Sequence, residues 1–199
     1  MVVITHATAL LSFIACVQAA ALTTRNAGAP IPGYGVEEIK WSLPATQDGK
    51  AASFHGTVQN VTAQLVKLNP SWKDSVKRSI PSRLVARAEW NVNCNPGHGW
   101  DYANTGVIRD GINHLRSLPA ADHPQNGPGP GNCGRVSCSY DSAIWWCNDH
   151  TEAFAVNGWD AIAEGAQRIV DHCINPNGNT GGQAFNADNW NVVVRKDNC

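Results

Sequence analysis

A histidine and a glutamate stand two positions apart in the segment NDHTE. His150 and Glu152 have side chains that exchange protons near neutral pH, and Arg135 would supply positive charge for a phosphate. Together they would suit a secreted hydrolase such as a ribonuclease. The sequence has no G-x-S-x-G, no H-E-x-x-H and no phosphate-binding glycine loop. We therefore predict no catalytic site, and keep these three residues as the alternative.

Cysteine is the second residue type that could do chemistry here. The chain has 7 cysteines, and Cys16 lies in the apolar N-terminal run, which leaves an even number beyond Trp90. Zinc sites need closely paired ligands such as C-x-x-C, which the sequence lacks. We expect disulfides made in an oxidising compartment, with no metal and no other cofactor. The residues concerned are Cys94, Cys133, Cys138, Cys147, Cys173 and Cys199.

The N-terminus predicts secretion. Residues 7–17 form an apolar run of signal-peptide length, and the small residues that follow suit cleavage near Ala19 or Ala21. The run is too short to span a bilayer. Residues 1–20 are therefore predicted to be a signal peptide, and we expect an extracellular protein without membrane insertion.

Charge divides the remaining chain into two parts. Residues 22–87 carry nine Lys or Arg against four Asp or Glu, whereas residues 88–199 carry six against twelve. Since nucleic-acid binding requires a basic patch, the acidic second part is not expected to bind nucleic acid.

A protease site is predicted between the two parts. Lys77 and Arg78 form the dibasic pair that kexin-type secretory proteases cut, and Arg87 is a second candidate. Residues 21–87 are thus predicted to be a pro-like region cleaved after Arg78 or Arg87. The alternative is an N-terminal extension that stays attached.

The pro-like region has one strand and one helix in its pattern. Ile39, Trp41 and Leu43 alternate as in a half-buried strand, and a helix is expected from Thr57 to Leu68. The sequon at Asn60 lies off the apolar face of that helix, where a glycan would be tolerated.

The second part, residues 88–199, is predicted to be a cysteine-rich effector domain. A short strand at 88–94 precedes a helix at 106–118, which Thr105 can cap. Residues 119–131 are rich in proline and glycine and predict an exposed irregular loop. A hairpin, a helix opened by Gly158 and a strand pair turning at 186–189 complete the order. This order predicts an α+β sandwich, with two helices packed on one antiparallel sheet.

The hairpin register follows from its loop. If Ser139, Tyr140 and Asp141 form a three-residue loop, strand partners are fixed by counting outward from it. Residues facing each other are then Cys133 and Cys147, Arg135 and Trp145, Val136 and Ile144, and Cys138 and Ser142. Alternation places the core face at Val136, Cys138, Ile144 and Trp146. The less buried face holds Cys133, Arg135, Ser137, Trp145 and Cys147. Trp100, Trp159 and Trp190 are expected in the core or in sheet packing.

The pattern from Asn91 onward resembles the killer-toxin-like family of small secreted fungal proteins, and a comparable layout occurs in necrosis-inducing fungal effectors. The matching pieces are NVNC, GVIRDGINHLRSL, GNCGRVSC with the apolar strand after it, IVDHC, GGQ and a valine-rich last strand ending in cysteine. The resemblance implies a split βαβ sandwich. It also implies disulfides joining Cys94 to Cys173, Cys133 to Cys147, and Cys138 to Cys199.

The activity that the resemblance implies is antagonism of other cells, attributed in that family to calcium-channel block. The family's prototype is basic and has a lysine close before the cysteine that matches Cys138. This chain has Val136 there, with Arg135 beside it, in an acidic domain. We therefore predict a monomeric toxin-like or virulence effector that binds an unknown protein or cell-surface target. Arg135 and Trp145, a cation–π pair on the less buried face, are the predicted contact residues. The alternative is that residues 119–131 or the pro-like region cover Trp145.

Overall fold

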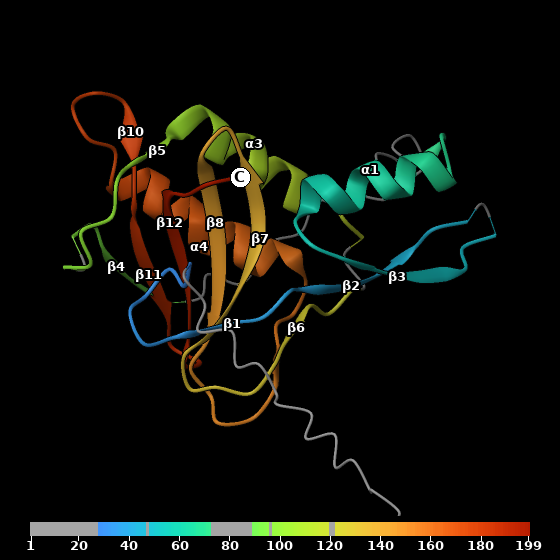
Figure 1. The fold of residues 1–199 in the computed structure, drawn as a ribbon, viewed down its shortest axis with the longest axis horizontal. Coiled ribbons are helices and arrows are strands. Elements are labelled where there is room, and N and C mark those ends of the chain that lie inside the picture. Colours follow the sequence, from blue (N-terminus) through green and yellow to red (C-terminus); the bar gives the residue numbers. More distant parts are fainter. Residues whose placement is uncertain (1–27, 47, 73–88, 96, 120–121) are drawn as a thin grey trace, which may run out of the picture.

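The protein has a mixed α+β fold (Figure 1). Three disulfides cross-link it. The computed structural model describes residues 28–46, 48–72, 89–95, 97–119 and 122–199. The described helices are α1 (Val58–Leu68), α3 (Thr105–Arg116) and α4 (Trp159–His172).

A six-stranded sheet forms the centre of the molecule, in the order β1-β7-β8-β12-β11-β4. β1 runs parallel to β7, and all other neighbours are antiparallel. The predicted hairpin and the predicted final strand pair are therefore adjacent parts of one sheet. The strand bounds are β1 (Gly35–Val36), β4 (Trp90–Asn93), β7 (Asn132–Ser139), β8 (Ser142–Asn148), β11 (Gly182–Asn186) and β12 (Trp190–Lys196).

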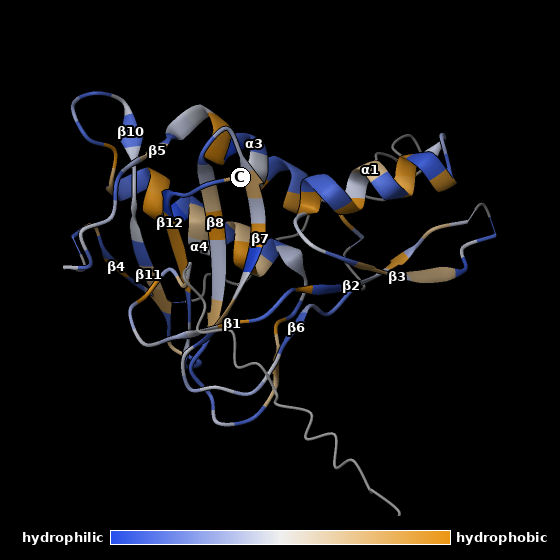
Figure 2. Ribbon diagram, in the orientation of Figure 1, coloured by the Kyte–Doolittle hydropathy of each residue, from blue (hydrophilic) through white to orange (hydrophobic). Residues whose placement is uncertain are grey.

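Helices α3 and α4 cover one face of this sheet, as predicted. α4 packs on β4, β11 and β12, while α3 packs on β7, β8 and α4. Strand alternation directs apolar side chains toward the helices, and Figure 2 shows the hydrophobic residues gathered where strands and helices meet. The fully buried strand residues on this face are Val136, Ile144, Trp146, Ala184, Val192 and Val194.

Residues 28–72, here called the N-terminal unit, share this core. The predicted strand is β2 (Lys40–Pro44), but it forms a hairpin with β3 (Ala51–His55) before α1 begins. β2 also pairs with β6 (Gln125–Asn126), which pairs with β9 (Phe154–Ala155). The unit therefore contributes strands to both larger sheets, and its apolar residues belong to the same buried cluster as those of α3 and α4.

Two local predictions were wrong. Asn104, not Thr105, caps α3, because the Asn104 side chain accepts a hydrogen bond from Val107 N at 3.1 Å. The segment 119–131 is also not wholly irregular and exposed, because it contains β6. In that strand the buried Asn126 side chain donates to the carbonyl oxygens of Asn132 and Trp146. The two remaining short strands, β5 (Ala103–Asn104) and β10 (Asn179–Thr180), pair with each other.

Among the described residues, no helix is both long enough and apolar enough to cross a membrane.

α4 approaches the sheet closely at Gly165, which generates a stability prediction. A Cβ at this position would lie 2.6 Å from Val192 Cγ2 and 2.7 Å from Trp90 Cη2. Gly165→Ala gains about 1 kcal/mol of helix propensity but overpacks this contact at a cost of about 1–3 kcal/mol. We expect a lower free energy of unfolding in urea denaturation. An unchanged or higher urea concentration at the unfolding midpoint would contradict this prediction, because it would show that α4 can shift away from Val192 and Trp90.

Candidate functional site

Three disulfides hold the strand ends and α4 together. Cys133 and Cys147 face each other across β7 and β8, with Cα atoms 4.0 Å apart. Cys94 joins the end of β4 to the C-cap of α4, and Cys138 joins β7 to the last residue, Cys199. These pairs match those that the hairpin register and the family resemblance predicted.

The hairpin turn has two residues, not the predicted three. Ser139 pairs with Ser142, and Tyr140 and Asp141 alone form the turn with φ angles of 42° and 55°. Two consecutive left-handed residues are the signature of a type I′ turn, whose twist matches that of the flanking strands. The predicted register is correct from Asn132 to Arg135 and wrong by one residue beyond it.

A β-bulge between Arg135 and Ser137 explains the difference, since one extra residue in β7 exchanges the two faces of the strand after it. Cys138 was predicted on the core face, but it packs with Cys133, Trp145 and Cys147 on the opposite face. Ser137 was predicted on that opposite face. Its hydroxyl instead accepts a hydrogen bond from Gln59 of α1.

The predicted contact pair forms, but its tryptophan is buried. The guanidinium carbon of Arg135 lies 5.5 Å from the Trp145 ring centroid, and Trp145 is only 4% exposed. The indole Nε1 donates to Asp197 at 3.0 Å, and Arg135 donates to the Asn198 carbonyl at 2.7 Å. Asp197 also receives a hydrogen bond from Arg195. Because it is buried, Trp145 cannot serve as an exposed anchor. It packs beneath Arg135, and the side chain of Arg135 remains 33% exposed.

The N-terminal unit and one loop residue cover the rest of this second sheet face. Ile31 is buried there with the Cys133–Cys147 disulfide and Trp145, and Tyr34, Val36 and Trp100 pack against the same cluster. Trp100 is only partly buried, at the rim of this face.

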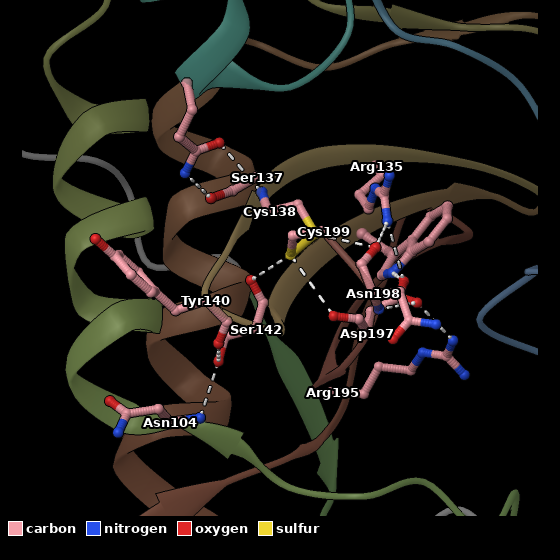
Figure 3. Close-up of a disulfide and its surroundings, with 12 residues drawn as sticks. Asn104, Arg135, Ser137, Cys138, Tyr140, Ser142, Arg195, Asp197, Asn198 and Cys199 are labelled. Carbon is pink, nitrogen blue, oxygen red and sulfur yellow. Dashed lines mark hydrogen bonds and ion pairs between the residues drawn. A yellow bond between two sulfur atoms is a disulfide. The ribbon is translucent and has the colours of Figure 1, made fainter.

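Tyr140 is the most exposed of three aromatic residues whose exposure the sequence did not predict, the others being Tyr102 and Phe185. It is 87% exposed at the tip of the hairpin, on a turn that several contacts hold in place. The Ser142 hydroxyl donates to the Tyr140 carbonyl, Asn104 N donates to that hydroxyl, and Asp197 N donates to the Asp141 carbonyl. Figure 3 shows the Cys138–Cys199 disulfide between Tyr140 and the Arg135 cluster.

A sequence signal for this site exists in retrospect. Type I′ turns favour Asn and Gly, because these residues tolerate left-handed backbone angles at little cost. Aspartate is tolerated there as well, but a tyrosine is unusual, and its left-handed conformation costs about 1–2 kcal/mol. Tyr140 was predicted to lie in the turn. Its left-handed conformation follows only if the turn has two residues, not the three that were predicted.

The alternative catalytic residues are not brought together. The His150 ring stacks on Phe154, with centroids 4.1 Å apart, and its Nε2 lies 2.6 Å from the Asp188 carbonyl oxygen. Glu152 is exposed, and its backbone carbonyl accepts a hydrogen bond from Asn148. Arg135 pairs with Trp145, which lies three residues, or about 10 Å, before the end of β8 at Asn148, and His150 follows that end.

The remaining predicted site residues lie in the N-terminal part of the chain. Asn60 is exposed on α1, on the side away from the core. Lys77, Arg78 and Arg87, the predicted processing residues, lie outside the described residues.

Within the described part of the chain, no group of three His, Cys, Asp or Glu side chains is placed to hold a metal ion. Comparisons with protein-family models, curated proteins and solved structures give no match for this chain.

A buried polar chain crosses the covered sheet face and ends on the N-terminal unit. Gln183 donates to Asn191, which donates to Asp149 at 2.7 Å. Tyr34 lies beside Asp149. Burial raises the pKa of Tyr34 from 10.0 to about 12, and the charge and hydrogen bond of Asp149 act in the same direction.

The raised pKa of Tyr34 predicts loss of stability in alkali. Between pH 10 and 12 the folded protein keeps the Tyr34 proton, whereas the unfolded chain has lost it. The stabilisation is therefore complete below pH 10 and is lost as the pH rises toward 12. We expect Tyr34→Phe to remove the tyrosine that ionises at the highest pH from an ultraviolet absorbance titration. The free energy of unfolding of this variant should also fall less steeply with pH. An unchanged titration curve would contradict this assignment.

Proposed function

We propose that the protein is a secreted fungal effector, toxin-like or acting in virulence, that binds an extracellular or membrane-protein target through the end of its β7–β8 hairpin. The observation that carries the proposal is Tyr140, an almost fully exposed aromatic side chain on a turn fixed by hydrogen bonds beside a disulfide. The signal-peptide pattern, the disulfides and the resemblance to killer-toxin-like and necrosis-inducing proteins support the secreted class.

Rigidity is the reason to assign binding to this turn. A turn whose backbone is already fixed loses little conformational entropy when a partner covers it, so more of the contact energy appears as affinity. Tyrosine supplies a large contact area with only two side-chain torsions, and it is enriched at the energetic centres of interfaces. The left-handed angles of Tyr140 and Asp141 cost free energy in the unbound protein, and such strain concentrates at functional positions.

Arg135 is the second proposed contact. Its side chain is 33% exposed, while Trp145 and Asp197 fix the position of its guanidinium. Arg135 and Arg195 share one carboxylate, that of Asp197, so the cluster retains a single excess positive charge. A protein surface that offers a carboxylate and an apolar pocket for a tyrosine ring would suit this end of the molecule.

The assay is application of the purified secreted protein to plant leaf tissue and to competing microbes. We expect Tyr140→Ala to raise the dose for half-maximal effect at least about tenfold, the loss of an interface centre. Arg135→Ala should raise it by a smaller factor. Intact disulfides, counted by mass spectrometry, and an unchanged circular dichroism spectrum would show that the fold persists. Full activity of a folded Tyr140→Ala protein would overturn the assignment.

A matched control tests the hydrolase alternative in the same assay. The double variant His150→Ala/Glu152→Ala removes both candidate proton-transfer groups and leaves Tyr140 and Arg135 in place. We expect its dose response to equal that of the unchanged protein. Loss of the effect in this variant, with retention in Tyr140→Ala, would favour a hydrolytic activity over binding.

Processing after Arg78 or Arg87 remains a prediction. Mass spectrometry of material secreted by a host with a kexin-type protease tests it. We expect two fragments that stay associated under native conditions, because the N-terminal unit supplies buried residues to the shared core. A single uncut chain would favour an extension that stays attached.

A further inference from the structure

The outer edge of β7 is closed by residues that lie far from it in the sequence. Gly35 N donates to the Gly131 carbonyl at 2.7 Å, and Glu37 N donates to the Cys133 carbonyl at 2.8 Å. This parallel pairing covers only Asn132 and Cys133, although β7 continues to Ser139. Beyond these residues, side chains of the N-terminal unit contact β7 at two places and α4 at a third.

The first of these contacts is a socket at Gly134. A Cβ at this position would lie 2.0 Å from Ile39 Cδ1 and 2.4 Å from Ile39 Cγ1. The side chain of Ile39 therefore occupies the space that any other residue at position 134 would fill. Because Gly134 has no side chain, β7 has space at this residue for one aliphatic side chain, that of Ile39.

The second contact is an aromatic slot at the start of α4. Trp41 lies flat on Trp159, with ring centroids 3.7 Å apart and an interplanar angle of 15°. The Trp159 indole donates to Asp122, which fixes the orientation of the ring that receives Trp41. Both rings are buried, so each would be exposed by withdrawal of the other.

The third contact is a latch at the far end of β7. Gln59 of α1 accepts a hydrogen bond from Cys138 N at 3.1 Å and donates to the Ser137 hydroxyl at 2.8 Å. A side-chain amide here takes the place that a paired backbone would occupy in a longer strand.

We propose that the outer edge of β7, with the Gly134 socket and the Trp159 slot, is a strand-accepting peptide site, and that residues 34–43 are its resident peptide. The partner class is an extended peptide whose first residues pair in parallel with the start of β7. It carries a branched aliphatic side chain for the socket and, two residues later, an aromatic ring for the slot. Addition of a strand to a sheet edge is a recurring mode of peptide recognition, in which main-chain bonds give affinity and pockets give specificity.

Covalent attachment keeps this site closed in the uncut chain. A tethered segment binds at a high effective concentration, so a free peptide competes poorly until the resident contacts are weakened. An open β7 edge would also invite indiscriminate strand pairing, which proteins prevent by covering such edges. The site is separate from Tyr140 and Arg135, so it stands or falls independently of the proposed effector function.

The test supplies the resident peptide from outside. A fluorescein-labelled peptide of residues 33–43, GYGVEEIKWSL, is titrated into the full oxidised chain and followed by fluorescence anisotropy. Ile39→Ala/Trp41→Ala empties the socket and the slot. We expect this variant to bind the peptide at least tenfold more tightly than the unchanged chain does. The peptide should also raise the melting temperature of the variant, and a peptide with alanine at both positions should do neither.

Trp72→Ala is the matched control variant. Trp72 is also a buried tryptophan of the N-terminal unit, but its indole donates to the Pro44 carbonyl within that unit. This variant loosens the unit without emptying the Trp159 slot, so we expect no tight peptide binding. Trp41→Ala alone repeats the comparison with less loss of packing, should the double variant not fold. Equal binding by Trp72→Ala, or no binding by either slot variant, would overturn the proposal.

Discussion

β7 is hydrogen-bonded along both edges, and the rest of the structure depends on this arrangement. Its inner edge pairs with β8 in an antiparallel hairpin, and its outer edge receives β1 and the Gln59 side chain. One face of the strand packs under α3, while the other carries Cys133 and Cys138, the anchors of two disulfides. A single strand thus joins the N-terminal unit, the helical layer and the C-terminal residues.

The bulge after Arg135 makes these roles compatible. Without the extra residue, Cys138 would face the helices and Ser137 would face the disulfide cluster. With it, Cys138 reaches Cys199, and Ser137 reaches Gln59 of the N-terminal unit. The same shift shortens the turn to two residues, which places Tyr140 at the tip in a left-handed conformation. The exposed aromatic residue and the closed outer edge therefore have one geometric origin.

Much of this fold follows from the sequence alone, and the reasons for the exceptions are physical. The hairpin register was predicted from a three-residue loop, which was one residue too long. The extra residue of the bulge offsets this error, so the predicted register is correct from Asn132 to Arg135. No residue type signals the bulge. Its position depends on tertiary contacts, because Cys138 must face Cys199 and Ser137 must face the N-terminal unit. Asn126 lies in a segment of turn-forming residues, and only the tertiary carbonyls of Asn132 and Trp146 make a strand there favourable. Trp145 was predicted on the less buried face, with cover by the pro-like region as the alternative. Alternation alone cannot decide between the two, and in the structure Asp197 and Ile31 of the N-terminal unit contact Trp145.

The opposite net charges of residues 22–87 and 88–199 suggested two separate units, but the structure places residues 28–72 within one core with the cysteine-bearing part. The stacked pair of Trp41 and Trp159 is the most direct contact between them. A double-mutant cycle of Trp41→Ala and Trp159→Ala, measured as the free energy of unfolding, tests whether this contact stabilises the protein. We expect a favourable coupling of about 0.5–1.5 kcal/mol or more. Strict additivity of the two substitutions would contradict a shared core.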